Sequence, residues 1–269
     1  MQHDKALEKF EDHYAKKLIL EHLGDDAEHL AEQFRVNNFF KRKYQSIVLD
    51  NKSLFEDAHV LDVGSNMGHW ATLYHLNGAR SVTCVEPRLN LVEGLNRFAV
   101  AEDLPIKAIQ GIHSDCPALG EKFQVVMLSN ITSYMPDVFD FFSRLRAITD
   151  HVIIGHHITM NTLHDDACTM DTGFNLSHRN AVDLRDRSYL DRPDGVQYDW
   201  NRIGDPHAEG RTCFWYYGIG FMRKLLDYLG YDVVRVNKQD NDGLYDGESQ
   251  GTSMVGDQTF YDMVLRVRK

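Results

Sequence analysis

The chain has 269 residues, of which 43% are hydrophobic, 26% charged and 11% aromatic; this composition supports a large buried core and excludes a disordered or fibrous protein. The 29 basic residues stand against 40 acidic ones, a formal net charge of −11, which disfavours nucleic acid as a partner because the molecule repels a phosphate backbone. The four cysteines form no CxxC pair, which argues against a zinc or redox motif and is typical of a reducing compartment.

The N-terminal region, residues 1–57, is predicted to form a helical cap. Apolar residues such as Leu7 and Phe10 recur there at roughly helical spacing among charges. Gly24 is a stop signal, and a second helical stretch is expected over residues 27–49. This stretch contains a small basic cluster, which is interpreted either as a solvated helix face or as an anion contact near a site: Arg35, Lys41, Arg42 and Lys43.

The N-terminal sequence also bears on location. The first residues, MQHDKALEKFEDHYAKK, lack the apolar stretch of a signal peptide, and no later segment approaches the roughly 20 apolar residues that span a bilayer. We therefore expect a cytoplasmic protein with no membrane association.

Residues 58–269 are predicted to form one α/β domain. Short apolar runs alternate with helical stretches, which is typical of βαβ units in a parallel, doubly wound sheet. The expected strands are His59–Val63, Ser81–Val85, Ile106–Ile109, Phe123–Leu128 and His151–Gly155. The expected helices between them are His69–Leu76, Leu89–Ala101 and Pro136–Ile148.

The pattern breaks after the fifth strand, and residues 156–213 are expected to form a long irregular insertion or lid. The pattern resumes with a helix over Ile219–Leu229, a strand over Tyr231–Val236 and a last strand over Thr259–Val267. No helix separates the last two strands. This predicts an antiparallel C-terminal hairpin at the end of a seven-stranded, mostly parallel sheet.

The most informative segment runs from Val60 to Ala71, VLDVGSNMGHWA, where a buried strand enters a glycine loop and then a helix. Gly64 lets the backbone turn sharply and approach a ligand, and Gly68 permits close packing at the helix start. Such a turn presents unpaired amide donors to a bound group. Asn66 stands where a dinucleotide fingerprint needs its second glycine, and no G-K-[ST] ending follows, so NAD, FAD and a P-loop are disfavoured.

The remaining pattern, D-x-G-x-x-x-G from Asp62 to Gly68, resembles the first motif of the class I S-adenosylmethionine-dependent methyltransferases. Glu86 ends the second strand in Val-Glu-Pro, where that family places an acidic residue. The predicted closing hairpin agrees with the antiparallel seventh strand of the family. The resemblance covers about residues 58–155 and 214–269 and implies a Rossmann-like fold with S-adenosyl-L-methionine as the cofactor.

The resemblance also implies roles for the matching residues. Asp62 would orient the loop or meet the methionine amino group, and Glu86 would accept hydrogen bonds from both ribose hydroxyls through its two oxygens. Adenine would lie over residues 111–115, where Ile112 and Asp115 are the alternatives. The expected cofactor contacts are Asp62, Gly64, Ser65, Asn66, Gly68, Glu86, Pro87, Ile112, His113, Ser129 and Asn130.

The catalytic residues are less constrained. The protein must position the partners of methyl transfer and, where the acceptor is a hydroxyl, supply a base. The base candidates are His156 and His157, directly after the fifth strand, and Tyr134. An interpretation of equal weight is that the two histidines only satisfy loop hydrogen bonds. No acidic residue lies between Ser129 and Tyr134, where metal-dependent catechol methyltransferases carry them, so no metal is expected.

The methyl acceptor stays open. Asn130 is followed by Ile131 and Thr132 rather than by two prolines and an aromatic residue, so methylation of adenine N6 is not supported. The leading hypothesis is methyl transfer to an oxygen or nitrogen of a small molecule. The alternatives are modification of a nucleotide in tRNA or another RNA, through Arg35 and Lys41–Lys43, and a non-catalytic scaffold that keeps the fold.

Overall fold

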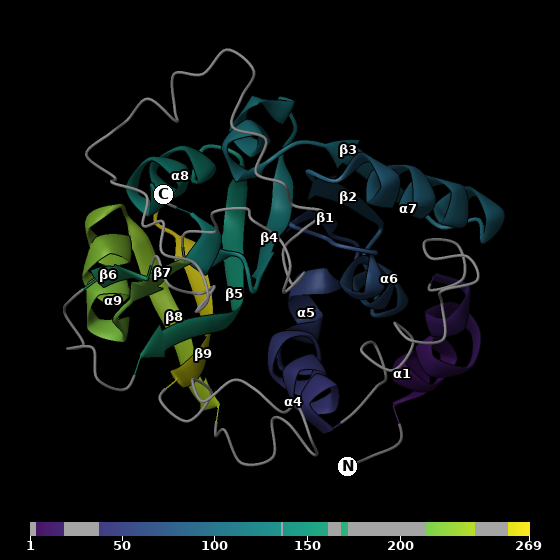
Figure 1. Cartoon of the computed structure of the whole chain (residues 1–269), viewed down its shortest axis with the longest axis horizontal. Helices are drawn as coiled ribbons and strands as arrows, with labels where there is room; N and C mark the ends of the chain where they lie inside the picture. The colour runs from purple at the N-terminus through teal and green to yellow at the C-terminus, as the bar shows by residue number, and fades with distance from the viewer. Residues whose placement is uncertain (1–3, 19–37, 136, 161–167, 172–213, 240–257) are drawn as a thin grey trace, which may run out of the picture.

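The computed structural model describes residues 4–18, 38–135, 137–160, 168–171, 214–239 and 258–269. A seven-stranded sheet with the order β3-β2-β1-β4-β5-β9-β8 runs through the molecule (Figure 1). Its strands are β1 His59–Val63, β2 Ser81–Glu86, β3 Ile106–Gln110, β4 Phe123–Ser129, β5 Thr149–Met160, β8 Tyr231–Gln239 and β9 Gln258–Val267. Strands β1 to β5 are parallel, whereas β9 is antiparallel to both of its neighbours. The predicted sheet and its C-terminal hairpin are confirmed.

The helical elements in the described part of the chain are α1 Lys5–Lys9, the π-helical η1 Phe10–Ala15, α4 Asn38–Ile47, η3 Leu49–Asn51, α5 Lys52–Phe55, α6 His69–Leu76, α7 Leu89–Ala101, η4 His113–Leu119, η5 Thr132–Tyr134, α8 Val138–Leu145 and α9 Ile219–Tyr228. The bounds of α6 and α7 are those predicted, and α8 and α9 are shorter. The second helical stretch is described from residue 38 onward, as α4, while Gly24 and residues 27–37 lie outside the described residues. No helix among these is long and apolar enough to cross a membrane.

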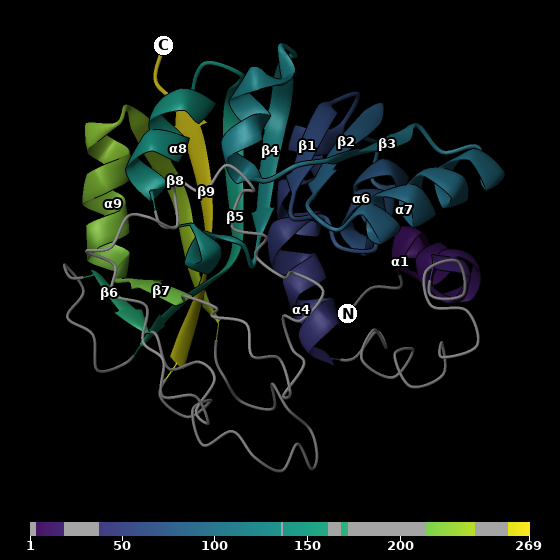
Figure 2. The same ribbon diagram turned by 45° about the horizontal axis from the view of Figure 1, so that its top comes forward.

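Two hydrophobic cores lie on opposite faces of the sheet. Successive strand residues point to opposite faces, so Val60 joins the core formed with α4, α6 and α7, while Leu61 joins the core formed with α8 and α9. Burial on both faces explains why the central strands are apolar runs rather than alternating ones. Figure 2 shows α8 and α9 close to each other and well apart from α6 and α7.

The N-terminal helices share the core of α6. Leu7 and Phe10 are buried there, and the Phe10 ring stacks on Phe40 of α4 with 6.1 Å between centroids. The Asp4 side chain caps α1 and also accepts a hydrogen bond from the Tyr44 hydroxyl at 2.9 Å. This packing places α4 beside the strand ends where a ligand of an open α/β sheet binds.

Strand β5 is longer than the sequence predicts. The predicted strand ends at Gly155, yet pairing with β9 continues to Met160 across a β-bulge between Ile154 and His157. Further along, β6 Cys168–Asp171 pairs with β7 Phe214–Tyr217. The interpretation of residues 156–213 as irregular is therefore wrong at its start, because antiparallel pairing with a distant strand supplies the hydrogen bonds. Residues 161–167 and 172–213 lie outside the described residues.

Candidate functional site

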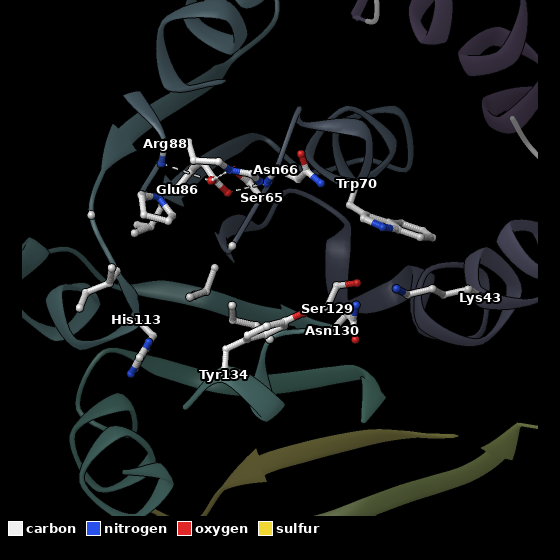
Figure 3. A pocket seen from close by; sticks show the side chains of 17 residues that line it. Lys43, Ser65, Asn66, Trp70, Glu86, Arg88, His113, Ser129, Asn130 and Tyr134 are labelled. Carbon is white, nitrogen blue, oxygen red and sulfur yellow. Dashed lines mark hydrogen bonds and ion pairs between the residues drawn. The ribbon is translucent and has the colours of Figure 1, made fainter. Parts of the chain in front are cut away.

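A cavity of about 330 Å³ lies at the carboxyl ends of β1, β2 and β4 (Figure 3). Most of the predicted site residues line it: Gly64, Ser65, Asn66, Glu86, Pro87, Ile112, His113, Ser129, Asn130 and Tyr134. The predicted residues Asp62, Gly68 and His157 do not line it. Residues that were not among the expected cofactor contacts or base candidates also line it: Lys43, Val63, Trp70, Val85, Arg88, Gly111 and Ile131.

The glycine loop after β1 is held against the end of β2. The amide of Gly64 donates to the Val85 carbonyl at 2.8 Å, and the amide of Asn66 donates to Oε2 of Glu86 at 2.9 Å. The backbone is left-handed at Gly64, with φ +72°, and a Cβ there would lie 2.9 Å from Cδ1 of Ile131 on the opposite wall. Glycine is therefore favoured at this position by the turn, and a side chain there would displace the tip of Ile131.

Gly68 begins α6 and serves packing. Its φ is +90°, and a Cβ would lie 2.4 Å from Cδ1 of Leu95 in α7. The predicted close packing at the helix start is confirmed, and it explains why Gly68 does not line the cavity itself.

Glu86 is an almost fully buried carboxylate, 2% exposed, at the end of β2. Its Oε1 accepts a charge-assisted hydrogen bond from Nε of Arg88 at 2.6 Å, while Oε2 faces the glycine loop. Charged acceptors of this kind form the stronger hydrogen bonds in proteins. The carboxylate therefore has a fixed orientation at the cavity wall.

Asp62 lies beneath the glycine loop and is 1% exposed. Its Oδ2 has no hydrogen-bond partner within the described part of the chain. Desolvation, aided by the nearby charge of Glu86 and opposed by that of Lys43, raises the pKa of Asp62 to about 7. A buried acceptor without a partner is rare in proteins, and a bound cationic donor would satisfy it.

The loop after β3 forms another part of the wall. Ile112 lines the cavity and is 37% exposed. The carboxylate of Asp115 accepts a hydrogen bond from the Ile112 amide at 2.8 Å. Of the two alternatives for this position, the structure brings Ile112 and not Asp115 to the cavity. His113 also lines it, its ring edge-on to Phe141, and burial lowers the pKa of His113.

The segment after β4 supplies the facing wall. Asn130 adopts a left-handed backbone with φ +56°, and its amide donates to the Gly155 carbonyl at 2.8 Å. Tyr134 follows in η5 and lines the cavity with Ser129 and Ile131. Burial raises the pKa of Tyr134, and the charge of Arg88 opposes that shift. The phenol is therefore neutral at physiological pH.

Lys43 of α4 is the main cavity residue that was not among the expected cofactor contacts. It is only 8% exposed, and its ammonium lies 5.2 Å from the centroid of the Trp70 ring. Desolvation lowers the pKa of Lys43 to about 8, against the attraction of Asp262 and Asp62. The basic cluster in the sequence was the available signal, and its interpretation as an anion contact did name Lys43. Figure 3 shows Lys43 and Glu86 on different sides of the cavity.

The two candidate histidines stand within β5 rather than after it. His157 is fully buried, its Nε2 2.8 Å from the Tyr217 carbonyl and its Nδ1 3.0 Å from Oγ1 of Thr132. Nε2 must therefore carry the proton and Nδ1 accepts from the threonine hydroxyl. Burial lowers the pKa of His157 to about 4. The side chain of His156 lies outside the described residues.

Within the described ranges, no group of three or more His, Cys, Asp or Glu side chains is arranged to hold a metal ion. His164, Asp165 and Asp166, whose imidazole and carboxylates could also bind a divalent ion, lie in the range 161–167, outside the described residues.

The chain is similar in structure, but not in sequence, to known proteins. No protein-family model matches the chain, and no curated protein matches it in sequence. Among solved structures, magnesium protoporphyrin IX methyltransferase from Synechocystis PCC 6803, with bound S-adenosylhomocysteine, is similar at a TM-score of 0.52 and 13% identity over 97% of each chain.

Two further solved structures are similar to the chain. The N-terminal domain of EvdMO1, studied with S-adenosylhomocysteine and D-fucose, has a TM-score of 0.53 and 12% identity, covering 86% of this chain and 84% of that one. TehB from Haemophilus influenzae has a TM-score of 0.51 and 15% identity, covering 86% of this chain and 66% of that one. The fold of the chain is thus the Rossmann-like fold of class I methyltransferases.

Proposed function

We propose that the chain is an S-adenosylmethionine-dependent methyltransferase and that the cavity holds the methyl donor. The observation that carries this proposal is the arrangement of charge around the glycine loop. Glu86 presents carboxylate oxygens on one side of the cavity, and Lys43 presents an ammonium group on another. A nucleoside with an amino-acid tail has matching groups, because its ribose hydroxyls donate hydrogen bonds and its carboxylate accepts them.

Each part of the cavity fits one part of that donor. Glu86 would accept from the ribose hydroxyls, and Ile112 with His113 would contact the adenine. The ligand's amino group would lie nearest Asp62, whose Oδ2 has no hydrogen-bond partner among the described residues. Lys43, desolvated beside Trp70, would pair with the ligand's carboxylate.

When bound, S-adenosylmethionine supplies an electrophilic methyl group on a sulfonium sulfur. The chain contributes positioning and exclusion of water, which together provide much of the rate in a displacement of this kind. We assign Tyr134 to the acceptor side of the cavity. Its neutral phenol would accept a hydrogen bond from the acceptor O–H or N–H and so turn a lone pair of the acceptor atom toward the methyl group.

His157 has another role in this proposal. Both of its ring nitrogens are engaged inside the protein, one with Thr132 at the start of η5 and one with β7. We therefore assign it to positioning Tyr134, which closes the same short helix. A catalytic role for His156 stays a prediction.

The described part of the basic cluster favours a small-molecule acceptor over RNA. The ammonium of Lys41 lies 3.8 Å from a carboxylate oxygen of Glu11, and Lys43 is buried at the cavity. Of the three described residues of the cluster, only Arg42 is exposed, which is a small surface charge for a phosphate backbone, on which RNA binding depends.

A transfer assay tests the proposal. The protein is incubated with S-adenosylmethionine carrying a labelled methyl group and with either a small-molecule extract or total tRNA. We expect label in the small-molecule fraction, dependent on Glu86. Label in tRNA alone would support the RNA alternative, and donor binding without transfer to either fraction would support the non-catalytic scaffold.

A further inference from the structure

Arg235 of β8 holds the carboxyl end of α4. Its Nη2 donates to the Ser46 carbonyl at 2.9 Å and to Oδ1 of Asn51 at 3.0 Å, and its Nη1 donates to the Asp50 carbonyl at 3.2 Å. Carbonyls at the end of a helix lack partners within the helix and need such donors. Asn237, two residues further along β8, adds a hydrogen bond to Oγ of Ser46 at 3.2 Å.

A β-bulge in β8 directs Arg235 toward α4. The register with β9 shifts between Val233 and Arg235. Val233 and Val236 both pack on the core formed with α8 and α9, whereas Arg235 and Asn237 reach α4 on the other face. Strict alternation would have placed Arg235 on the same face as Val233, so the extra residue reverses the side on which it lies.

The end of α4 that Arg235 holds is one turn from the cavity. Lys43 precedes Ser46 by three residues, so the two lie on neighbouring positions of one helix face. On the same face, Ile47 packs against Gly155 of β5, where a Cβ would lie 3.2 Å from Cγ2 of Ile47. A helix moves as a rigid element over one turn. Together with the buried packing of Tyr44 and Ile47, the anchor at Ser46 therefore contributes to where the ammonium of Lys43 stands.

The position of this ammonium is sensitive because buried acids lie on two elements around it. Asp62 of β1 and Asp262 of β9, 1% and 3% exposed, both attract Lys43. Release of α4 would let the ammonium settle nearer either acid rather than at the cavity wall. In a low-dielectric environment, a small displacement changes such charge interactions strongly.

We infer that Arg235 is a positioning residue for ligand binding: by anchoring the end of α4, it holds Lys43 where a carboxylate of the ligand meets it. This inference rests on the proposed function, since that function supplies the carboxylate. It links the C-terminal hairpin to the donor cavity through an N-terminal helix.

The test compares two ligands that differ only in the carboxylate, S-adenosylhomocysteine and its decarboxylated analogue. We expect Arg235→Gln to weaken S-adenosylhomocysteine binding by about tenfold, as for a misplaced charged hydrogen bond, and to change binding of the analogue by less than about twofold. Arg266→Gln is the matched control, because it removes an exposed arginine from the adjacent strand β9. An equal loss for both ligands would indicate a merely structural role and would overturn the inference.

A double substitution shows whether Arg235 acts through Lys43. If it does, Arg235→Gln has no further effect on S-adenosylhomocysteine binding once Lys43→Met is present, whereas additive losses contradict it. Amide hydrogen exchange of the free protein provides a readout without any ligand. Exchange in residues 40–51 should accelerate in Arg235→Gln but not in Arg266→Gln.

The two levels of failure are distinguishable. A wild-type protein that does not bind S-adenosylhomocysteine contradicts the proposed function. Unchanged exchange of α4 in Arg235→Gln overturns the inference whatever the protein binds.

Discussion

Arg88 lies with its Nε 2.6 Å from Oε1 of Glu86, so the carboxylate at the end of β2 is already paired inside the candidate site. The Arg88 amide is also within 3.3 Å of the same oxygen. A carboxylate can accept further hydrogen bonds beside these donors. The pair therefore orients Glu86 for a diol without removing its capacity to bind one.

Replacing Glu86 tests this assignment directly. Glu86→Gln keeps the shape of the side chain but turns one acceptor oxygen into a donor and removes the charge. Each charged hydrogen bond contributes about 1.5 to 3 kcal/mol, so S-adenosylhomocysteine should bind about ten to a hundred times more weakly in calorimetry. Glu93→Gln, on the exposed face of α7, is the control. An unchanged affinity in Glu86→Gln would exclude the carboxylate from the site.

Alanine substitutions at two glycines with left-handed backbones distinguish an effect on ligand binding from an effect on stability. Gly64 and Gly78 have φ values of +72° and +106°, so alanine at either costs about 1 to 2 kcal/mol in the free energy of unfolding. Only Gly64 lines the cavity, and its new Cβ would press on Ile131, while at Gly78 the nearest atom is 3.5 Å away. Gly64→Ala should weaken S-adenosylhomocysteine binding by about tenfold, and Gly78→Ala should not. Denaturant unfolding and titration calorimetry measure the two effects, and equal binding by both variants would contradict the placement of the loop.

The Lys43 assignment predicts a pH dependence of binding. Burial lowers the pKa of Lys43 to about 8, so the free protein loses this positive charge as the pH rises above that value. Affinity for a ligand carboxylate should then fall with increasing pH. In Lys43→Arg the guanidinium stays charged, so the loss of affinity caused by deprotonation of Lys43 should not occur. Titration of the ligand's own amino group is common to both proteins, and parallel profiles would argue against contact between Lys43 and the carboxylate.

His157 predicts a pH dependence of stability. Its pKa is lowered from 6.5 to about 4 in the folded protein, so between these values the unfolded chain binds the proton more tightly. The stabilisation is complete above pH 6.5 and is lost as the pH falls toward 4, by about 3 kcal/mol in total. His157→Gln keeps one donor and one acceptor but cannot titrate. Denaturant unfolding across this window should show a shallower pH dependence for the variant, and identical slopes would refute the prediction.

The sequence predicts the fold well because its signals are local. The apolar runs of β1, β2 and β4 reflect burial on both faces, and α7 begins and ends where the sequence pattern places it. The glycine loop was predictable for the same reason, because the turn follows directly on the buried strand in the sequence. The role of Glu86 came instead from the resemblance to the methyltransferase family.

The features that the sequence does not predict depend on distant contacts. The polar residues after Gly155 continue β5 only because β9 pairs with them. Lys43 reaches the cavity because aromatic packing around Phe40 and Trp70 fixes α4. Arg235 reaches α4 because a bulge reverses the alternation of β8. In each case the partner lies far along the chain, where periodicity carries no information.

Titration of the wild-type protein with S-adenosylhomocysteine in a calorimeter tests the central claim most directly. We predict saturable binding at one site in the micromolar range, and no binding to Gly64→Arg, whose side chain would fill the cavity beside Ile131. A folded wild-type protein that binds no S-adenosylhomocysteine would contradict the assignment of this cavity to the methyl donor.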